Sequence, residues 1–188
     1  MVQLLADLFI SLDGFAAGDD VGPYFGYGGP ELDAWIGERL DEPQEVVLGR
    51  RTYEILAAMS GHAADPASTR LTALPKIVFS STLQEPLAWE RTRLLRGDAA
   101  EVLGALKRES TTPLRTMGSL TLVRSLLEAG LVDRLRLTVF PLVLGERGRE
   151  PFLAGVGAQD LRLDESLVLD GRVVSLTYVP CGARSGWQ

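Results

Sequence analysis

Three short segments carry groups suited to binding phosphate, and each follows a predicted strand. They are Gly49-Arg50-Arg51-Thr52, Ser80-Ser81-Thr82 and Gly118-Ser119. They offer guanidinium groups, hydroxyls and glycine backbone near helix starts, where unpaired N–H groups and the helix dipole favour an anion. Each signal alone is weak, because Ser and Thr after a strand are more often turn or cap residues. Together at one edge of a sheet, they favour a ligand with several phosphates.

A dinucleotide that carries a 2′-phosphate fits this layout. It needs a pyrophosphate site and a separate site of guanidinium and hydroxyl groups. No Gly-x-Gly-x-x-Gly motif follows the first predicted strand, so a Rossmann arrangement is excluded at its usual place.

A glycine-rich segment from 14 to 30 is the candidate wall for a second ligand. A loop of this length inside a compact domain is usually functional. Its rings at Tyr24, Phe25 and Tyr27 would be exposed unless a ligand or a partner covers them, so they are candidates for stacking on a flat substrate ring. They could equally form a dimer contact.

Alternating strands and helices must position these segments. Apolar patterning predicts strands at 2–11, 46–48, 76–79, 92–95, 114–117, 132–144, 161–169 and 172–179, and helices at 30–40, 50–59, 99–108 and 119–129. The segment 61–72 is polar and alanine-rich, and no strand or helix is predicted for it. Asp170-Gly171 predicts a hairpin turn. The fold class is therefore α/β: a three-layer structure with a mostly parallel sheet, helices on both faces and a C-terminal antiparallel hairpin.

Composition restricts the class of protein. The 188 residues, 46% hydrophobic and 23% charged, are typical of one globular domain, expected over 1–180 with a polar tail at 181–188. No apolar run is long enough to span a bilayer, and the N-terminus is a poor signal peptide, so we expect a cytoplasmic protein. A net charge of −6 argues against nucleic acid as a partner.

The chain has a single cysteine, Cys181, and a single histidine, His62. These two residues cannot form an intramolecular disulfide or a zinc site of Cys and His ligands, and we expect no metal. His62 is interpreted as a loop residue.

The sequence resembles the reductase domain that ends the bifunctional riboflavin-biosynthesis deaminase-reductase, which is itself similar to dihydrofolate reductase. The likeness is carried by residues 11–14, 48–54, 78–81, 117–119, 130–133 and 140–145, in the expected order over nearly the whole chain. One His and one Cys cannot build the zinc motif of the deaminase, so the likeness is to a stand-alone reductase domain.

This resemblance implies NADPH as the cofactor. It places Arg50 and Ser80 or Ser81 at the 2′-phosphate, and Thr52 at the pyrophosphate after Gly49. It also implies that Gly118, Ser119 and Leu120 lie along the pyrophosphate, and that Ala17 and Gly18 lie near the nicotinamide.

Two acids are candidates for the catalytic proton donor. Asp33 lies close to where dihydrofolate reductase keeps its substrate-binding carboxylate, with Glu31 as a competitor, although both fit better as first-turn acids that favour the helix dipole. Asp13 would sit at the mouth of the site, and it is also a good turn residue before Gly14.

The resemblance implies an NADPH-dependent reductase that transfers a hydride to a pterin-like or pyrimidine-like substrate. Reduction of 5-amino-6-(5-phosphoribosylamino)uracil in riboflavin biosynthesis is the specific candidate. The alternative is a nucleotide-binding or sensing protein without turnover, since no proton donor is unambiguous. The long strand at 132–144 and the apolar hairpin would suit a two-fold interface, so we expect a homodimer.

Overall fold

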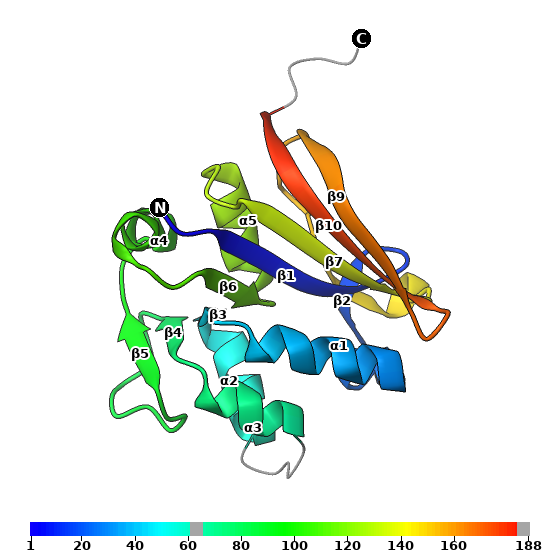
Figure 1. Cartoon of the computed structure of the whole chain (residues 1–188), viewed down its shortest axis with the longest axis horizontal. Helices are drawn as coiled ribbons and strands as arrows, with labels where there is room; N and C mark the ends of the chain where they lie inside the picture. The colour runs from blue at the N-terminus through cyan, green and yellow to red at the C-terminus, as the bar shows by residue number, and fades with distance from the viewer. Residues whose placement is uncertain (61–65, 184–188) are drawn as a thin grey trace.

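Eight strands form one mostly parallel sheet in the computed structural model, in the order β5-β4-β3-β6-β1-β7-β10-β9 (Figure 1). The structure describes residues 1–60 and 66–183; His62 lies outside the described residues. The strands are β1 (Leu4–Ser11), β3 (Glu45–Gly49), β4 (Lys76–Phe79), β5 (Thr92–Leu95), β6 (Leu114–Met117), β7 (Arg134–Phe140), β9 (Gln159–Leu169) and β10 (Val173–Ala183). The predicted α/β fold class is confirmed.

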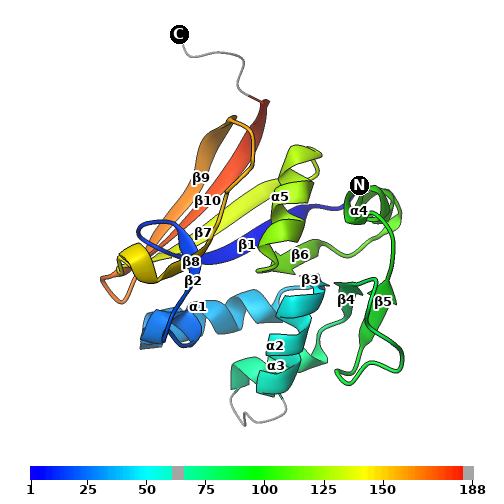
Figure 2. The same cartoon turned by 180° about the vertical axis from the view of Figure 1, so that it is seen from behind.

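Five α-helices cover the two faces of this sheet. They are α1 (Pro30–Asp41), α2 (Arg50–Ser60), α3 (Pro66–Ala73), α4 (Ala99–Glu109) and α5 (Leu120–Glu128). Helices α1, α2 and α3 pack on one face, and α4 and α5 pack on the other. Figure 2, from behind, shows α5 lying over β1 and β6. Both faces therefore carry apolar side chains, as expected of parallel strands.

Parallel pairing brings the carboxyl ends of four strands to one edge. β1 pairs with β6, β6 with β3, and β3 with β4, all in parallel. Ser11, Gly49, Phe79 and Met117, the last residues of β1, β3, β4 and β6, therefore lie along the same edge. This is where ligands bind in open α/β sheets.

The hairpin of β9 and β10 adds antiparallel strands to the far side of β7. Its turn places Asp170 and Gly171 at φ values of 50° and 65°, and Arg172 N donates to Leu169 O. Positive φ at both central residues is the type I′ geometry that an Asp-Gly pair favours. The predicted hairpin is confirmed.

Lys76 is fully buried at the start of β4 beneath the end of α3. Its Nζ donates to the carbonyl oxygens of Leu71, Thr72 and Leu74 at 3.3, 2.8 and 2.7 Å, and it lies 4.6 Å from the ring centroid of Trp89. The ammonium group thus satisfies carbonyls that the end of the helix would leave without partners. Burial lowers the pKa of Lys76 to about 8.

Four local predictions were wrong. Residues 66–73, for which no helix was predicted, form α3, and Leu71 of this helix packs against the cluster around Trp89. β7 ends at Phe140 rather than at 144. The chain turns there, and Leu142 N donates to Phe140 O. The segment after β1 contains a strand, β2 (Phe15–Gly18), paired with β8 (Gly148–Pro151). Finally, β10 runs to Ala183, which pairs with Gln159, beyond the predicted strand end at 179.

No helix within the described residues is long and apolar enough to cross a bilayer.

Candidate cofactor and substrate site

The hydroxyl of Ser119 joins two of the predicted phosphate-binding segments. Ser119 Oγ accepts from Gly49 N at 2.6 Å and donates to Thr52 Oγ1 at 2.8 Å. A β-carbon added to Gly49 would lie 3.1 Å from this hydroxyl, so glycine allows the close approach. The start of α2 and the start of α5 are thereby held side by side at the carboxyl edge of the sheet.

The N-terminus of α5 is not capped by the side chain of Ser119. Gly118 and Ser119 have φ values of 65° and 61°, and the side chain of Ser119 makes no capping bond to the helix. Its hydroxyl is used by Gly49 and Thr52 instead. The first N–H groups of α5 therefore lack the side-chain cap that Ser usually gives.

Arg50 and Arg51 begin α2 with exposed guanidinium groups. Arg50 Nη1 lies 3.1 Å from Glu54 Oε1, and Arg51 Nη1 lies 2.6 Å from Glu150 Oε1. Both ion pairs are at the surface, where such pairs contribute little stability. Either guanidinium can therefore exchange its carboxylate for an anionic ligand.

The loop after β4 uses its first serine as a local cap. Ser80 Oγ accepts from Thr82 N and Leu83 N at 3.1 and 3.0 Å, which is the turn role that competes with phosphate binding. Ser81 is exposed. Arg96, which follows β5, donates to Ser80 O and Leu83 O at 3.2 and 2.8 Å. Our sequence reasoning missed Arg96, although its position directly after a strand could have revealed it.

Ala17 and Gly18 lie on β2, paired with Arg149 and Gly148 of β8. A β-carbon at Gly18 would come within 2.9 Å of the side chain of Leu144. The residues expected near the nicotinamide are therefore part of a two-stranded sheet rather than an open loop.

Asp13 organises the loop that follows β7. Its carboxylate accepts from Ser11 Oγ at 2.7 Å, from Leu144 N at 3.0 Å and from Gly145 N at 2.8 Å. These hydrogen bonds, led by that from Ser11, lower the pKa of Asp13 to about 2. The group is ionised at neutral pH, which favours the turn role over proton donation.

Asp33 and Glu31 lie at the start of α1, and both are exposed. Glu31 accepts from Asp170 N, while the carboxylate of Asp170 accepts from Glu31 N and Leu32 N at 3.1 and 3.0 Å. The residue of this turn that faces the sheet is Leu32, which is 1% exposed. Asp33 is thus turned away from the face that α1 presents to the sheet.

The aromatic residues of the glycine-rich segment pack on the sheet. The ring centroids of Phe25 and Tyr27 lie 5.3 and 5.9 Å from that of Phe140, and Tyr24 lies 5.4 Å from Phe9. Tyr27 Oη also donates to Pro141 O at 3.0 Å. Phe140 therefore covers Phe25 and Tyr27 in part, whereas Tyr24 remains 39% exposed, as expected from the sequence.

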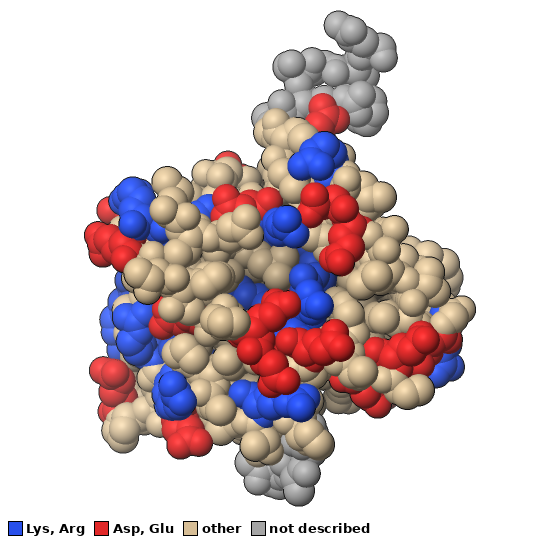
Figure 3. Space-filling view, in the orientation of Figure 1, with Lys and Arg blue, Asp and Glu red and all other residues tan. Residues whose placement is uncertain are grey.

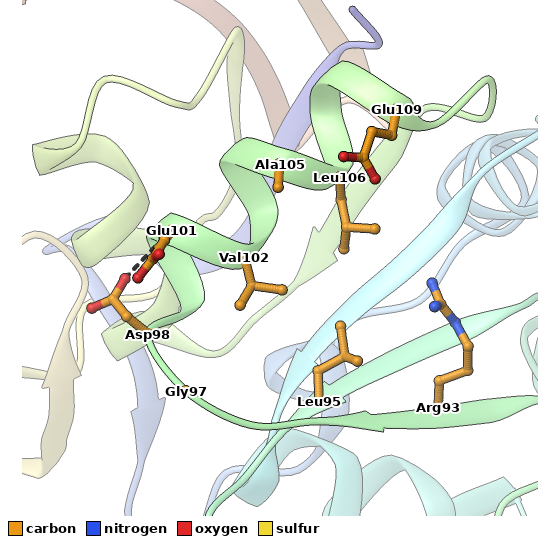
Figure 4. A pocket seen from close by; sticks show the side chains of 9 residues that line it. All are labelled: Arg93, Leu95, Gly97, Asp98, Glu101, Val102, Ala105, Leu106 and Glu109. Atoms are coloured by element: carbon orange, nitrogen blue, oxygen red, sulfur yellow. Dashed lines mark hydrogen bonds between the residues drawn. The ribbon is translucent and has the colours of Figure 1, made fainter.

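A hollow of about 400 Å³ lies elsewhere, between β5 and α4 (Figure 4). Its lining consists of Arg93, Leu95, Gly97, Asp98, Glu101, Val102, Ala105, Leu106 and Glu109. Three carboxylates against one guanidinium disfavour a phosphate there. On the face shown in Figure 3, basic and acidic side chains are intermixed rather than gathered into one basic field.

Residues 2–175 match the family model described as the RibD C-terminal domain. The chain belongs to this family. It is 23% identical over 181 residues to the uncharacterised protein YyaP of Bacillus subtilis strain 168, covering 94% of each chain.

Two solved structures show the same fold. A putative riboflavin biosynthesis protein from Shewanella sp. PV-4 superposes with a TM-score of 0.70 at 21% identity, covering 96% of this chain and 99% of that one. Dihydrofolate reductase from Enterococcus faecalis, in complex with NADP(H), superposes with a TM-score of 0.64 at 17% identity, covering 96% and 97%. The resemblance to this reductase family and to the dihydrofolate reductase fold is therefore confirmed.

Proposed function

We propose that this member of the RibD C-terminal family is an NADPH-dependent reductase of a small, flat heterocycle. The observation that carries the proposal is the Ser119 bridge, which joins Gly49, Thr52 and the uncapped start of α5 at one edge of the sheet. Backbone N–H groups, hydroxyls and a helix dipole converge there, as an anionic pyrophosphate requires.

Preference for a 2′-phosphate is assigned to Arg50 with Ser80 or Ser81. β3 and β4 are neighbours, with Gly49 opposite Phe79, so Arg50 and Ser80 follow paired residues. Arg96 holds the carbonyls of the Ser80 loop and adds positive charge nearby. This set of groups provides the guanidinium and hydroxyl contacts that a phosphate monoester favours.

The substrate is a pterin-like or pyrimidine-like ring. Bound NADPH would supply a hydride to it. Phe9, Phe140 and the rings of Tyr24, Phe25 and Tyr27 provide flat apolar surfaces beside the cofactor edge. Reduction of 5-amino-6-(5-phosphoribosylamino)uracil is the specific candidate within this class.

Titration with NADPH and NADH tests the cofactor assignment. We expect NADPH to bind more tightly than NADH, measured by tryptophan fluorescence or calorimetry. Arg50→Ala removes a charge-assisted hydrogen bond and should weaken NADPH binding by about tenfold to a hundredfold while changing NADH binding little. Arg108→Ala, an exposed arginine in the last turn of α4, is the matched control.

The outcomes separate clearly. Loss of the NADPH preference in Arg50→Ala but not in Arg108→Ala would support the proposal. Equal affinities for the two nucleotides, or no binding of either, would refute the 2′-phosphate site.

A nucleotide-binding protein without turnover is the second candidate. Asp13 is held ionised by its hydrogen bonds, and Asp33 is exposed on the far side of the turn from Leu32. Neither is well placed to deliver a proton. NADPH oxidation with a panel of pteridines and pyrimidines distinguishes the two candidates, because the binding protein would oxidise none at a rate above that without protein.

A homodimer through the β9 end of the sheet is also part of the proposal. Val168 and Leu163 are 64% and 49% exposed, and they pair with Val174 and Tyr178 on the same face of the hairpin. Among the described residues, neither cartoon view draws an α-helix over β9 (Figures 1 and 2). An exposed apolar strand at a sheet edge favours association. Val168→Asp should yield a monomer in sedimentation velocity, whereas Ile55→Asp, an exposed site on α2, should not.

A further inference from the structure

A charged cluster is buried under α1, on the face of the sheet that this helix covers. Asp7 of β1 lies opposite Arg136 of β7, and the two side chains are 3% and 7% exposed. Asp7 Oδ2 accepts from Arg115 Nε at 2.9 Å and from Arg115 Nη2, and it lies 3.5 Å from Arg136 Nη1. The same oxygen of Asp7, Oδ2, therefore interacts with the guanidinium groups of both arginines.

Three polar atoms of this cluster have no hydrogen-bond partner among the described residues. They are Asp7 Oδ1, Arg136 Nη1 and Thr138 Oγ1. Thr138 follows Arg136 on the same face of β7, pairs with Phe9 and is fully buried. Buried polar atoms are nearly always paired, and leaving them unpaired is unfavourable. An acceptor, a donor and a hydroxyl on neighbouring strands therefore point to a polar ligand.

The cluster lies beside the proposed cofactor edge. Asp7 O accepts from Gly118 N at 3.1 Å, which places its backbone against the segment assigned to the pyrophosphate. Toward the carboxyl ends of β1 and β7, the next side chains on this face are Phe9 and Phe140, whose ring centroids are 5.6 Å apart. A flat ring on these aromatic side chains would turn one edge toward Asp7 and Arg136.

The segment that covers these rings holds a strained backbone. Tyr24 and Phe25 have φ values of 52° and 53°, which non-glycine residues rarely adopt. The ring of Phe25 is tilted against that of Phe140, with an angle of 42° between the ring planes, and it occupies the position that a ligand on Phe140 would need. Withdrawal of Phe25 would relieve the strain at this residue and expose the face of Phe140.

We propose that Asp7 and Arg136 read the edge of the substrate ring, and that this edge is a cyclic amide with an N–H next to a C=O. The ring N–H donates to Asp7 Oδ1, and the ring carbonyl accepts from Arg136 Nη1, with Thr138 Oγ1 as a further partner. This assignment rests on the proposed function, and it names the residues of this chain that select the substrate ring.

A pair of pteridines that differ only in their N–H groups tests this assignment. Pteridine-2,4-dione carries ring N–H groups, and its 1,3-dimethyl derivative does not. Binding of each to the protein is followed by pteridine fluorescence, with and without NADP⁺. We expect the dione to bind at least about tenfold more tightly than the dimethyl derivative, because a hydrogen bond to a charged group is lost.

Variants assign this preference to the cluster. Asp7→Asn should reduce the preference by about tenfold. Thr138→Val removes a hydroxyl that has no partner in the free protein, so it should leave the unfolding free energy unchanged or higher while weakening dione binding several-fold. Thr116→Val is the control: Thr116 is equally buried, its Oγ1 accepts from Asp7 N, and it faces the other side of the sheet. It should lower stability and leave the preference unchanged.

Each outcome is decisive. A preference that is lost in Asp7→Asn and weakened in Thr138→Val supports the assignment, and Thr138→Val decides alone if Asp7→Asn does not fold. Equal binding of the two pteridines, binding of neither, or a preference unchanged in Thr138→Val overturns it. NADPH binding is measured separately. If NADPH does not bind, the proposed cofactor is refuted, but the comparison of the two pteridines still tests the role of Asp7, Arg136 and Thr138.

Discussion

The carboxylate of Asp170 lies directly over Gly29, where a β-carbon on residue 29 would come within 2.3 Å of it. From this position Asp170 accepts from Glu31 N and Leu32 N, so the hairpin turn caps the start of α1. Asp170 therefore connects the turn of the β9–β10 hairpin to the end of the glycine-rich segment.

Asp170→Ala should lower the free energy of unfolding by about 1–2 kcal/mol, because two N–H groups of α1 lose their acceptor. Urea unfolding measures the change. Asp170→Asn keeps an acceptor oxygen and tolerates positive φ, so its free energy of unfolding should fall much less than that of Asp170→Ala.

Gly29→Ala should be strongly destabilising in the native background and much less so when Asp170 is replaced by Gly, since the clashing carboxylate is then gone. Urea unfolding of the two single variants and the double variant measures this coupling. Additive effects would contradict the steric account.

Replacing Ser119 should weaken both the fold and nucleotide binding. Ser119→Ala removes the acceptor of Gly49 N and the donor to Thr52, and we expect a loss of about 1 kcal/mol in unfolding free energy. NADPH affinity, measured by calorimetry, should also fall.

Ser119→Gly separates the hydroxyl from the backbone. It loses the same hydrogen bonds but relieves the positive φ of 61° at this position. It should be more stable than Ser119→Ala and bind NADPH equally poorly. If both variants bind as the native protein does, the bridge has no part in the site.

The buried ammonium group of Lys76 predicts a pH dependence of stability. Its pKa is about 8 in the folded protein and 10.5 when unperturbed, so between these values the unfolded chain binds more protons. The free energy of unfolding contributed by this group should therefore rise as pH increases from 8 to 10.5. Lys76→Met, which cannot titrate, should lack the rise.

Urea unfolding of the native and Lys76→Met proteins at pH 7, 8, 9 and 10 measures this difference, and titrations common to both cancel. The variant should also be less stable at pH 7 by about 1–3 kcal/mol, because the carbonyls of α3 lose their donor. A difference that is constant across this range would mean that Lys76 titrates at its usual pKa.

Asp13 should give a second pH dependence of stability, of the same sign as that of Lys76 but at acidic pH. Its pKa is lowered from 3.8 to about 2, so the contribution of its carboxylate is fully present above about pH 4 and is lost as pH falls toward 2. The stability gap between the native protein and Asp13→Asn should shrink over that window in acid unfolding. An acidic limb of activity above pH 4 would then have to come from another group.

The sheet and the edge that holds the candidate site could be predicted from the sequence, whereas the residues under α1 could not. Strand ends at Gly49 and Gly118 could be read from apolar runs followed by glycine, because parallel strands bring such ends together. In the sequence, Asp7 is one acidic residue within the predicted strand at 2–11, and nothing beside it indicates a binding role. Its partners come from β6 and β7, more than a hundred residues away, and local patterns carry no information on such pairing.

The same limit explains the errors in the loops. β2 forms because β8 returns beside it, and α3 is ordered by contact with the cluster around Trp89. In both places tertiary contacts override a composition typical of loops. Arg96 could have been predicted from the sequence. It follows β5 directly, and the ends of parallel strands meet at one edge of the sheet, as was assumed for Gly49.

The position of β1 between β6 and β7 affects how the chain is made on the ribosome. This strand is synthesised early, yet both of its neighbours and the residue that caps α1 lie at 114 or beyond. The central apolar strand must therefore wait, unpaired, until most of the chain has been translated. Until β6 and β7 are synthesised, both edges of β1 are unpaired, and unpaired apolar strand edges make an incomplete chain prone to aggregation.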